Sequence, residues 1–311
     1  MSDHALLVRA SRLYYELGET QEQVAERLGV TRAHVSKLLK QARAAGVVEI
    51  RIVDRLEAPS PAADELRERF DLRAVHLAAG GGDAAADLAR RRVGRLAAQV
   101  LMASVRDGLV VGIGDGSAVS ATADAVEAPA TPIDATVVPL CGGYWQAGAA
   151  REPFRRIADA IGAAVHGLLA PGLLDDAATR DALMAHAGVR AVAELWDRLD
   201  VALFGIGGPA WSEVTLGRDV AAELAAGRAV GETLIAPFDV DGRFVGEQLR
   251  SRTIAFDARR LAGVPLTIAV AEGGAKVQPI LGALRAGIVK VLVSDLSTAE
   301  AVLALDRRAA A

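Results

Sequence analysis

Glycine-rich turns that directly follow apolar stretches are the parts of this 311-residue chain best suited to chemistry. Four such turns come after residues 109–113, 135–141, 200–206 and 266–271, and their members are Gly114, Asp115, Gly116, Ser117, Gly142, Gly143, Gly207, Gly208, Gly273 and Gly274. Glycine allows backbone N–H groups to close around an anion, and the N-terminus of a following helix adds a partial positive charge. A single glycine pair is more often only a tight turn, but four of them favour a site for a phosphate or a similar polar group.

Charged side chains stand beside two of these turns. Lys276 follows Gly273-Gly274 at the start of an expected helix, where the helix dipole disfavours a cation unless an anion lies between them. A lysine that simply extends into solvent is the alternative. Glu272 and Asp295 stand at strand ends, where each could accept hydrogen bonds from sugar hydroxyls or cap a helix.

The sequence contains few motifs typical of enzymes. Residues 112–116 read GIGDG, which is not the GxGxxG of dinucleotide sites, and no GxxxxGK[ST] or GxSxG occurs. The five histidines show no metal-ligand spacing. Cys141 lies in an apolar stretch, which favours an inert core thiol over a nucleophile. The sequence predicts no catalytic residue, no metal ligand and no cofactor.

The elements that must hold the turns are apolar strands alternating with helices. Besides the four strands already named, residues 74–78 and 289–294 read as strands. Helices are expected at 63–70, from Asp83 or Asp87 to 105, from Ser117, and from Thr298, and an antiparallel hairpin at 238–245 with Asp241-Gly242 as its turn. This alternation predicts a Rossmann-like α/β domain with a mostly parallel sheet covered on both faces. Its glycine turns would share the edge of the sheet where ligands bind.

Residues 20–43 predict a second kind of site, because they have the spacing of a helix-turn-helix. Thr20 caps a first helix with Gln23 as its capping-box partner, Gly29 makes the turn, and Thr31 caps a second helix. Apolar residues recur at helical spacing on both helices: Val24, Ala25, Leu28, Val35, Leu38 and Leu39. A helix over 3–17 would complete a three-helix unit.

The second helix of that motif carries basic residues and no acidic one. Such side chains reach phosphates and base edges in a major groove, and the predicted DNA contacts are Thr20, Gln21, Thr31, Arg32, His34, Ser36, Lys37, Lys40 and Arg43. A helical hairpin with a solvated basic face is the alternative. Residues 47–54 read as a short strand, either a wing with Arg51 on a phosphate or a plain connector.

Charge and composition divide the chain in the same way. The net charge is −4, but residues 1–55 carry a net +2 and the remainder −6, which suits a DNA-binding domain (1–55) before an effector domain (56–311). Pro59 and Pro61 mark a linker at 56–62. One cysteine, no secretory signal and no long apolar run predict a soluble cytoplasmic protein with no membrane contact.

The order of motifs YYELGETQEQVAERLGVTRAHVSKLLKQAR, VVGIGDGSA, VVPLCGGY, LFGIGG, GRAVGE and VAEGGAKVQPILGALRAG resembles that of the SorC family of sugar-responsive bacterial transcriptional regulators. The resemblance implies an effector domain like sugar-phosphate isomerases and deaminases without their catalysis, a sugar, sugar phosphate or polyol effector, and a homo-oligomer, a tetramer or dimer, on double-stranded operator DNA. The family's first phosphate loop falls on 114–117, with Ser117 where threonine is usual. Its late lysine motif falls on Lys276, and Glu232 matches an acidic position near the effector pocket.

Two alternatives stay open at this stage. One is a sugar-phosphate isomerase or deaminase that carries a DNA-binding head, which would need a base over the sugar carbon. The other is a scaffold whose helix-turn-helix binds protein, which would show no salt-dependent affinity for DNA.

Overall fold

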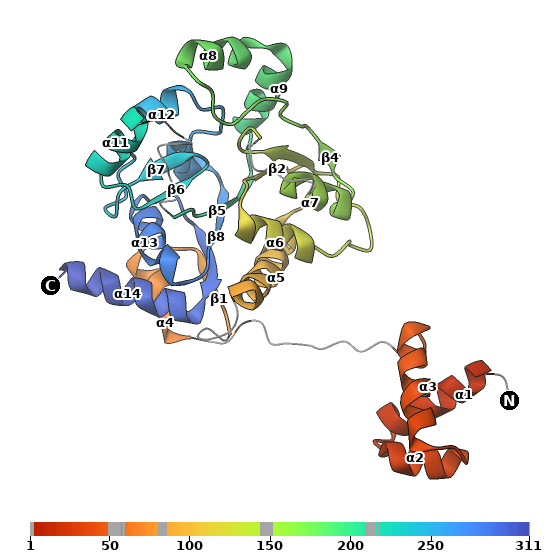
Figure 1. Cartoon of the computed structure of the whole chain (residues 1–311). Helices are drawn as coiled ribbons and strands as arrows, with labels where there is room; N and C mark the ends of the chain where they lie inside the picture. Colours follow the sequence, from red (N-terminus) through yellow and green to blue (C-terminus); the bar gives the residue numbers. More distant parts are fainter. Residues whose placement is uncertain are drawn as a thin grey trace. The chain divides into compact units, whose positions relative to one another are not determined.

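The computed structural model describes residues 3–48, 57, 60–79, 86–143, 152–208, 216 and 218–310. The chain forms two compact units, residues 1–54 and 55–311 (Figure 1). Most of the expected wing strand with Arg51, residues 56, 58 and 59 of the expected 56–62 linker and the glycine loop with Asp83 lie outside the described residues.

The N-terminal unit is helical, as predicted. Helix α1 (Asp3–Ser11) continues as the π-helical turn η1 (Arg12–Glu16), and α2 (Gln21–Leu28) and α3 (Arg32–Ala44) follow. The capping box of Thr20 and Gln23 is formed, Gly29 ends α2 with φ 67°, and Thr31 caps α3. The predicted apolar positions pack together with residues of α1, and Val24 and Val35 are fully buried. The helix-turn-helix is therefore set by local capping and by a small shared core.

The second unit is built on a seven-stranded sheet in the order β1-β9-β8-β5-β2-β3-β4. Every pair of neighbouring strands in it is parallel, which confirms the predicted sheet type. The strands are β1 (Ala74–Ala78), β2 (Val110–Ile113), β3 (Thr136–Pro139), β4 (Ala164–Val165), β5 (Val201–Gly205), β8 (Leu266–Val270) and β9 (Val291–Asp295). All carboxyl ends consequently face the same edge.

Helices cover both faces of this sheet (Figure 1). One face packs against α5 (Ala86–Ser104), α6 (Ser117–Ala125) and α7 (Pro153–Ile161). The other packs against α4 (Pro61–Arg69), α9 (Ala187–Trp196), α13 (Val277–Arg285) and α14 (Leu296–Ala310). Central strands are buried on both sides, which explains their continuous apolar runs.

An irregular region lies over the carboxyl ends of the strands. It holds α8 (Ala177–Ala185), α11 (Arg218–Ala226), α12 (Glu247–Ser251) and the antiparallel pair β6 (Gly231–Thr233) and β7 (Ala236–Phe238). The 3-10 helix η2 (Ala258–Gly263) instead lies towards the amino ends, because it leads directly into β8 and its Arg260 pairs with Asp197, just before β5. The predicted turn at Asp241-Gly242 is present, with Phe238 and Phe244 bridged across it. The β6–β7 hairpin was not predicted, because its turn residues are Leu234 and Ile235, which are not turn formers.

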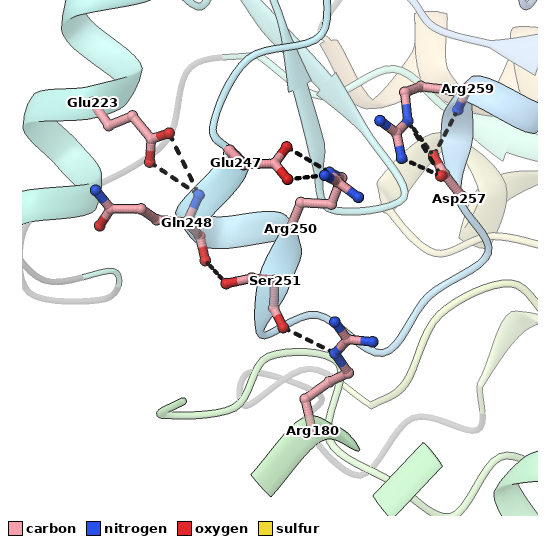
Figure 2. A network of polar contacts seen from close by, with 8 residues as sticks. All are labelled: Arg180, Glu223, Glu247, Gln248, Arg250, Ser251, Asp257 and Arg259. Atoms are coloured by element: carbon pink, nitrogen blue, oxygen red, sulfur yellow. Dashed lines mark hydrogen bonds and ion pairs between the residues drawn. The ribbon is translucent and has the colours of Figure 1, made fainter. Parts of the chain in front are cut away.

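Polar contacts tie α12 to its neighbours (Figure 2). The backbone N–H of Gln248 donates to both carboxylate oxygens of Glu223 on α11, at 3.4 and 3.3 Å. Arg180 of α8 donates to the carbonyl of Ser251 at 2.9 Å, and Glu247 pairs with Arg250 within α12. These contacts hold α8, α11 and α12 together in the irregular region. Within the part of the chain that the structure describes, no helix is long and apolar enough to cross a membrane.

Candidate functional site

The predicted DNA contacts are nearly all exposed on the N-terminal unit. Val35, Leu38 and Leu39 of α3 turn inward, while the polar side chains Thr20, Thr31, Arg32, His34, Ser36, Lys37, Lys40 and Arg43 are exposed and Gln21 is half-buried. The basic face is therefore not used for packing. Two of these residues also cap helices. The Thr20 hydroxyl accepts from the Gln23 N–H at 3.3 Å, and the Thr31 hydroxyl accepts from the His34 N–H at 3.2 Å.

The glycine turns do gather at the carboxyl edge of the sheet, but they do not form an open cradle of N–H groups. Six of the seven predicted effector glycines already donate within the protein: Gly114 to the Leu203 carbonyl (2.7 Å), Gly116 to Asp115 Oδ1 (2.7 Å), Gly142 to the Ile254 carbonyl (2.9 Å), Gly143 to the Ala170 carbonyl (3.0 Å), Gly207 to the Glu232 carbonyl (2.8 Å) and Gly273 to Asp295 Oδ2 (3.1 Å). The sequence offered the turn at Gly114, Gly116 and Ser117 to a phosphate, but in the structure the amides of Gly114 and Gly116 already donate within the protein.

Close packing is what the glycines provide instead. A Cβ on Gly142 would lie 2.6 Å from the Ala170 carbonyl oxygen, so the two backbones could not approach with any larger residue. A Cβ on Gly207 would lie 2.0 Å from Glu232 Oε1. The missing side chain at Gly207 is thus the space into which the Glu232 carboxylate fits.

Glu232 is held in place through both its backbone and its carboxylate. Its backbone pairs with Gly207 in both directions, at 2.8 and 3.2 Å, and its Oε2 accepts from the backbone N–H of Ile235 at 3.1 Å. Burial raises the pKa of this carboxyl, against the opposing effects of the Ile235 hydrogen bond and the charge of Lys276. Glu232 thus meets any ligand as a carboxyl that holds its proton more tightly than usual.

The turn that Glu232 holds has an unusual backbone. Leu234 and Ile235 have φ of 50° and 62°, a region that bulky and β-branched residues rarely adopt. Both are buried, Leu234 against Gly114 and Ile235 against Gly172. Such outliers concentrate at ligand sites, where the surrounding structure must hold them.

Lys276 lies at the same carboxyl edge of the sheet, in the turn that follows β8. It is the N-cap residue of α13, at the end of the 3-10 turn η3 (Gly274–Lys276), which confirms the predicted position at a helix start. Its Nζ lies 3.7 Å from the place of a Cβ on Gly208 and makes no hydrogen bond or ion pair with any described residue. Burial lowers the pKa of this amine, although the charges of Glu232 and Glu272 oppose the shift.

Glu272 and Asp295 prove to differ in their surroundings. Asp295 is buried and accepts from the Thr298 N–H (2.9 Å), the hydroxyls of Thr298 (2.5 Å) and Ser297 (2.6 Å), and Gly273. Burial alone would raise the pKa of Asp295, but these hydrogen bonds hold it below its ordinary value. Of the two roles that the sequence allowed, Asp295 therefore has that of a helix cap, and both of its carboxylate oxygens already accept hydrogen bonds within the protein.

Glu272 instead pairs with a residue that sequence reasoning missed. Arg90 Nε donates to Glu272 Oε1 at 3.0 Å, and a second nitrogen of Arg90 lies 3.3 Å from Asp87. Burial raises the pKa of Glu272, and Arg90 and Lys276 oppose that shift. No local pattern marks Arg90, since 182 positions separate it from Glu272. Its place on the helix after β1, near the same sheet edge, was the available signal.

The β2 turn completes the edge. Asp115, Gly116 and Ser117 are exposed, and α6 starts at Ser117 after the N-cap residue Gly116, which has φ 119° and no side chain to cap the helix. The backbone of Asp115 lies against Gly205 at the end of β5. Cys141 beside it is buried, and burial together with the charges of Asp115 and Glu232 raises the pKa of its thiol, so the sulfur stays protonated and unreactive. The described residues contain no group of three or more His, Cys, Asp or Glu that could hold a metal ion.

Comparison with known proteins gives two family matches. A sugar-binding domain family matches residues 54–304, and a Crp-like helix-turn-helix domain matches residues 4–63.

Relatives match over nearly their whole length. The chain is 28% identical to the sorbitol operon regulator of Klebsiella pneumoniae, over 97% of this chain and 98% of that one. It is 28% identical to the deoxyribonucleoside regulator of Bacillus subtilis, over 96% and 97%. The crystal structure of the full-length Klebsiella regulator, SorC, superposes with a TM-score of 0.79 at 27% identity and covers 97% of this chain and 99% of that chain.

Proposed function

The chain belongs to the SorC family of transcriptional regulators, which join a helix-turn-helix to a sugar-binding domain, and we propose that a sugar, sugar phosphate or polyol bound at the sheet edge sets its affinity for operator DNA. The named relatives are regulators of sorbitol and deoxyribonucleoside genes, which supports this class of function.

The DNA half of the proposal uses the exposed face of α3. Arg32, Lys37, Lys40 and Arg43 supply positive charge on a helix without acidic residues, and His34 and Ser36 supply groups that hydrogen-bond to base edges. In this arrangement Arg32 leaves its exposed contact with Glu22, 3.5 Å away, for a phosphate. An exposed pair of this kind contributes little and is easily exchanged.

One observation supports the effector half of the proposal: the ammonium of Lys276 has no partner among the described residues and faces the half-buried Glu232 across the carboxyl edge. A hydroxyl-rich ligand can satisfy both, accepting from Lys276 and donating to Glu232. Asp115 and Ser117 at the start of α6 would contact the other end of the ligand, and Glu272 one of its hydroxyls. The predicted glycines then shape the pocket rather than bind: Gly114, Gly116, Gly142, Gly143, Gly207, Gly208 and Gly273.

Regulation follows from linkage between the two sites. A ligand that binds one arrangement of the protein better than another shifts the population towards it. With the protein acting in the cytoplasm as a dimer or tetramer, that shift changes how two recognition helices fit an operator with two half-sites. A coupling of about 1–3 kcal/mol would alter operator affinity by roughly 5- to 150-fold.

The proposal is a sensor without catalysis. Asp295 is occupied as a cap and Cys141 is held protonated, so neither is free to act as a base or nucleophile. Incubation with ribose 5-phosphate or glucosamine 6-phosphate tests this, and turnover above background would establish an enzyme.

The binding proposal is tested with a matched pair of variants. A thermal-shift screen of polyols and sugar phosphates identifies a ligand that raises the melting temperature of the wild type. Lys276→Ala should lose this shift and keep operator binding, whereas Lys40→Ala should keep the shift and bind the operator more weakly. A normal ligand response in Lys276→Ala would remove this lysine from the site, and no stabilising ligand at all would remove the effector site itself.

A further inference from the structure

We propose that Arg90 is a positioning residue of the effector site: its ion pair holds Glu272 and thereby keeps the ammonium of Lys276 available for the ligand. The inference rests on the proposed function only in taking this edge as the ligand site. It assigns a role to a residue that lies outside every glycine turn.

The ion pair is built to restrain Glu272. The Glu272 side chain is only 10% exposed, and Arg90 Nε lies 3.0 Å from its Oε1. Asp87, one turn earlier on α5, also pairs with the guanidinium, with its Oδ1 3.3 Å from Arg90 Nη1. A charge-assisted hydrogen bond at a nearly buried carboxylate is stronger than an exposed ion pair.

Charged groups from three elements face Lys276: Glu272 at the end of β8, Glu232 on β6 and Arg90 on α5. Either carboxylate could neutralise the ammonium, yet neither lies within ion-pair distance of it in the described structure. Glu232 is held by the Ile235 N–H at 3.1 Å, and Glu272 is held by Arg90. The Lys276 Nζ accordingly points towards Gly208 on the β5 turn.

Replacing Arg90 should free the Glu272 carboxylate to move. Glu272 would lose its pairing cation in a largely buried place, and the nearest remaining cation would be Lys276. A new pair between them would occupy the ammonium that the ligand needs. Removing Glu272 as well would take away the competitor and free Lys276 again.

The chain allows a direct measurement, because it has only four lysines, Lys37, Lys40, Lys276 and Lys290. In the full-length protein, reductive methylation with ¹³C-formaldehyde labels their amines, Lys276→Arg assigns one signal by its loss, and NMR follows the titration of Lys276 with pH. Arg90→Gln should move the Lys276 midpoint to higher pH. Arg90→Gln with Glu272→Gln should bring it back towards the wild-type midpoint.

The control is Arg95→Gln, which removes an exposed charge from the same helix and should leave the midpoint unchanged. Glu272→Gln alone should lower it, and this variant serves if Arg90→Gln does not fold. A folded Arg90→Gln with an unchanged midpoint, an unchanged midpoint in Glu272→Gln, or an equal shift in Arg95→Gln would overturn the inference. The titration needs no ligand. It can therefore refute the role of Arg90 without refuting the effector site, and the ligand screen can refute the effector site without refuting the role of Arg90.

Discussion

Gly207 is the position where one added methyl group should disturb the site most. A Cβ there would lie 2.0 Å from Glu232 Oε1 and 2.8 Å from its Cδ, so Gly207→Ala must push the carboxylate away. Glu232 then gives up the 3.1 Å hydrogen bond from Ile235 N–H, which holds a turn with two left-handed non-glycine residues.

The expected cost follows from those two effects. Overpacking costs about 1–3 kcal/mol, and about 1 kcal/mol applies here because the obstructing carboxylate is the end of a flexible side chain. A buried N–H left without a partner costs about 1–3 kcal/mol, so we expect a total loss of about 2–4 kcal/mol. For a unit of this size that lowers the melting temperature by about 5–15 °C. Gly208→Ala is the matched control, since among the described residues its Cβ would meet nothing closer than Lys276 Nζ at 3.7 Å. It should cost less than about 0.5 kcal/mol.

The assay is urea and thermal unfolding of the full chain, followed by circular dichroism, for both alanine variants. The same step is then made in a Glu232→Ala background, where the obstructing carboxylate is absent. There Gly207→Ala should cost less than about 0.5 kcal/mol, a coupling that only contacting residues show. If Gly207→Ala is as stable as Gly208→Ala, or costs as much without Glu232 as with it, the described packing of Glu232 is wrong.

Three further predictions concern single side chains. Lys37→Ala should weaken operator binding evenly across sequences and reduce the slope of log affinity against log salt by about 1; an unchanged slope in gel-shift titrations would count against a phosphate contact. Thr31→Ala should destabilise α3 by about 1 kcal/mol, seen as faster amide exchange in its first turn; equal exchange would mean that the cap contributes nothing. Because burial raises the folded-state pKa of Glu232, its contribution is favourable below the unfolded value near 4.5 and is lost as pH rises through the folded value. The stability of Glu232→Gln relative to wild type should therefore rise with pH above about 4.5, and a flat difference would refute the assignment.

Local signals were enough to predict the helix-turn-helix. The capping box at Thr20, the turn at Gly29 and the cap at Thr31 each depend on residues within four positions of one another, and all three are formed. The strands of the body were equally accessible, since a run buried on both faces must be continuously apolar. The strand predicted at 74–78 coincides with β1.

The edge region resisted prediction because its contacts are not local. Arg90 and Glu272 meet through the fold, and nothing near either residue in the sequence indicates the other. The β6–β7 hairpin turns at Leu234-Ile235, where turn chemistry predicts no turn. That conformation exists only because tertiary contacts with Gly114 and Gly172, and the Glu232 carboxylate, hold it.

The predicted glycines do follow the strands at the carboxyl edge of the sheet, but most of their amides are used within the protein. Sequence reasoning offered Gly114 and Gly116 to a phosphate, and both donate within the protein, as do four of the other five. What Gly207 contributes is room for Glu232, and what Gly142 contributes is a backbone contact.

If the proposed effector binds at this edge, it would be recognised by side chains, chiefly those of Asp115, Ser117, Glu232 and Lys276. The choice of ligand would then depend on how the fold positions these side chains. A side chain that recognises a ligand can also be moved by it, whereas a backbone amide within the sheet cannot. If a hydroxyl of the effector takes over the Glu232 carboxylate, the Ile235 N–H must find another acceptor or the turn must change. Ile235 packs with Leu216, Val220, Leu224 and Leu249, which anchor α11 and α12. The ligand would thereby reach the outer layer of the domain through one strained turn, and a route of that kind can shift a quaternary equilibrium without any movement of the sheet.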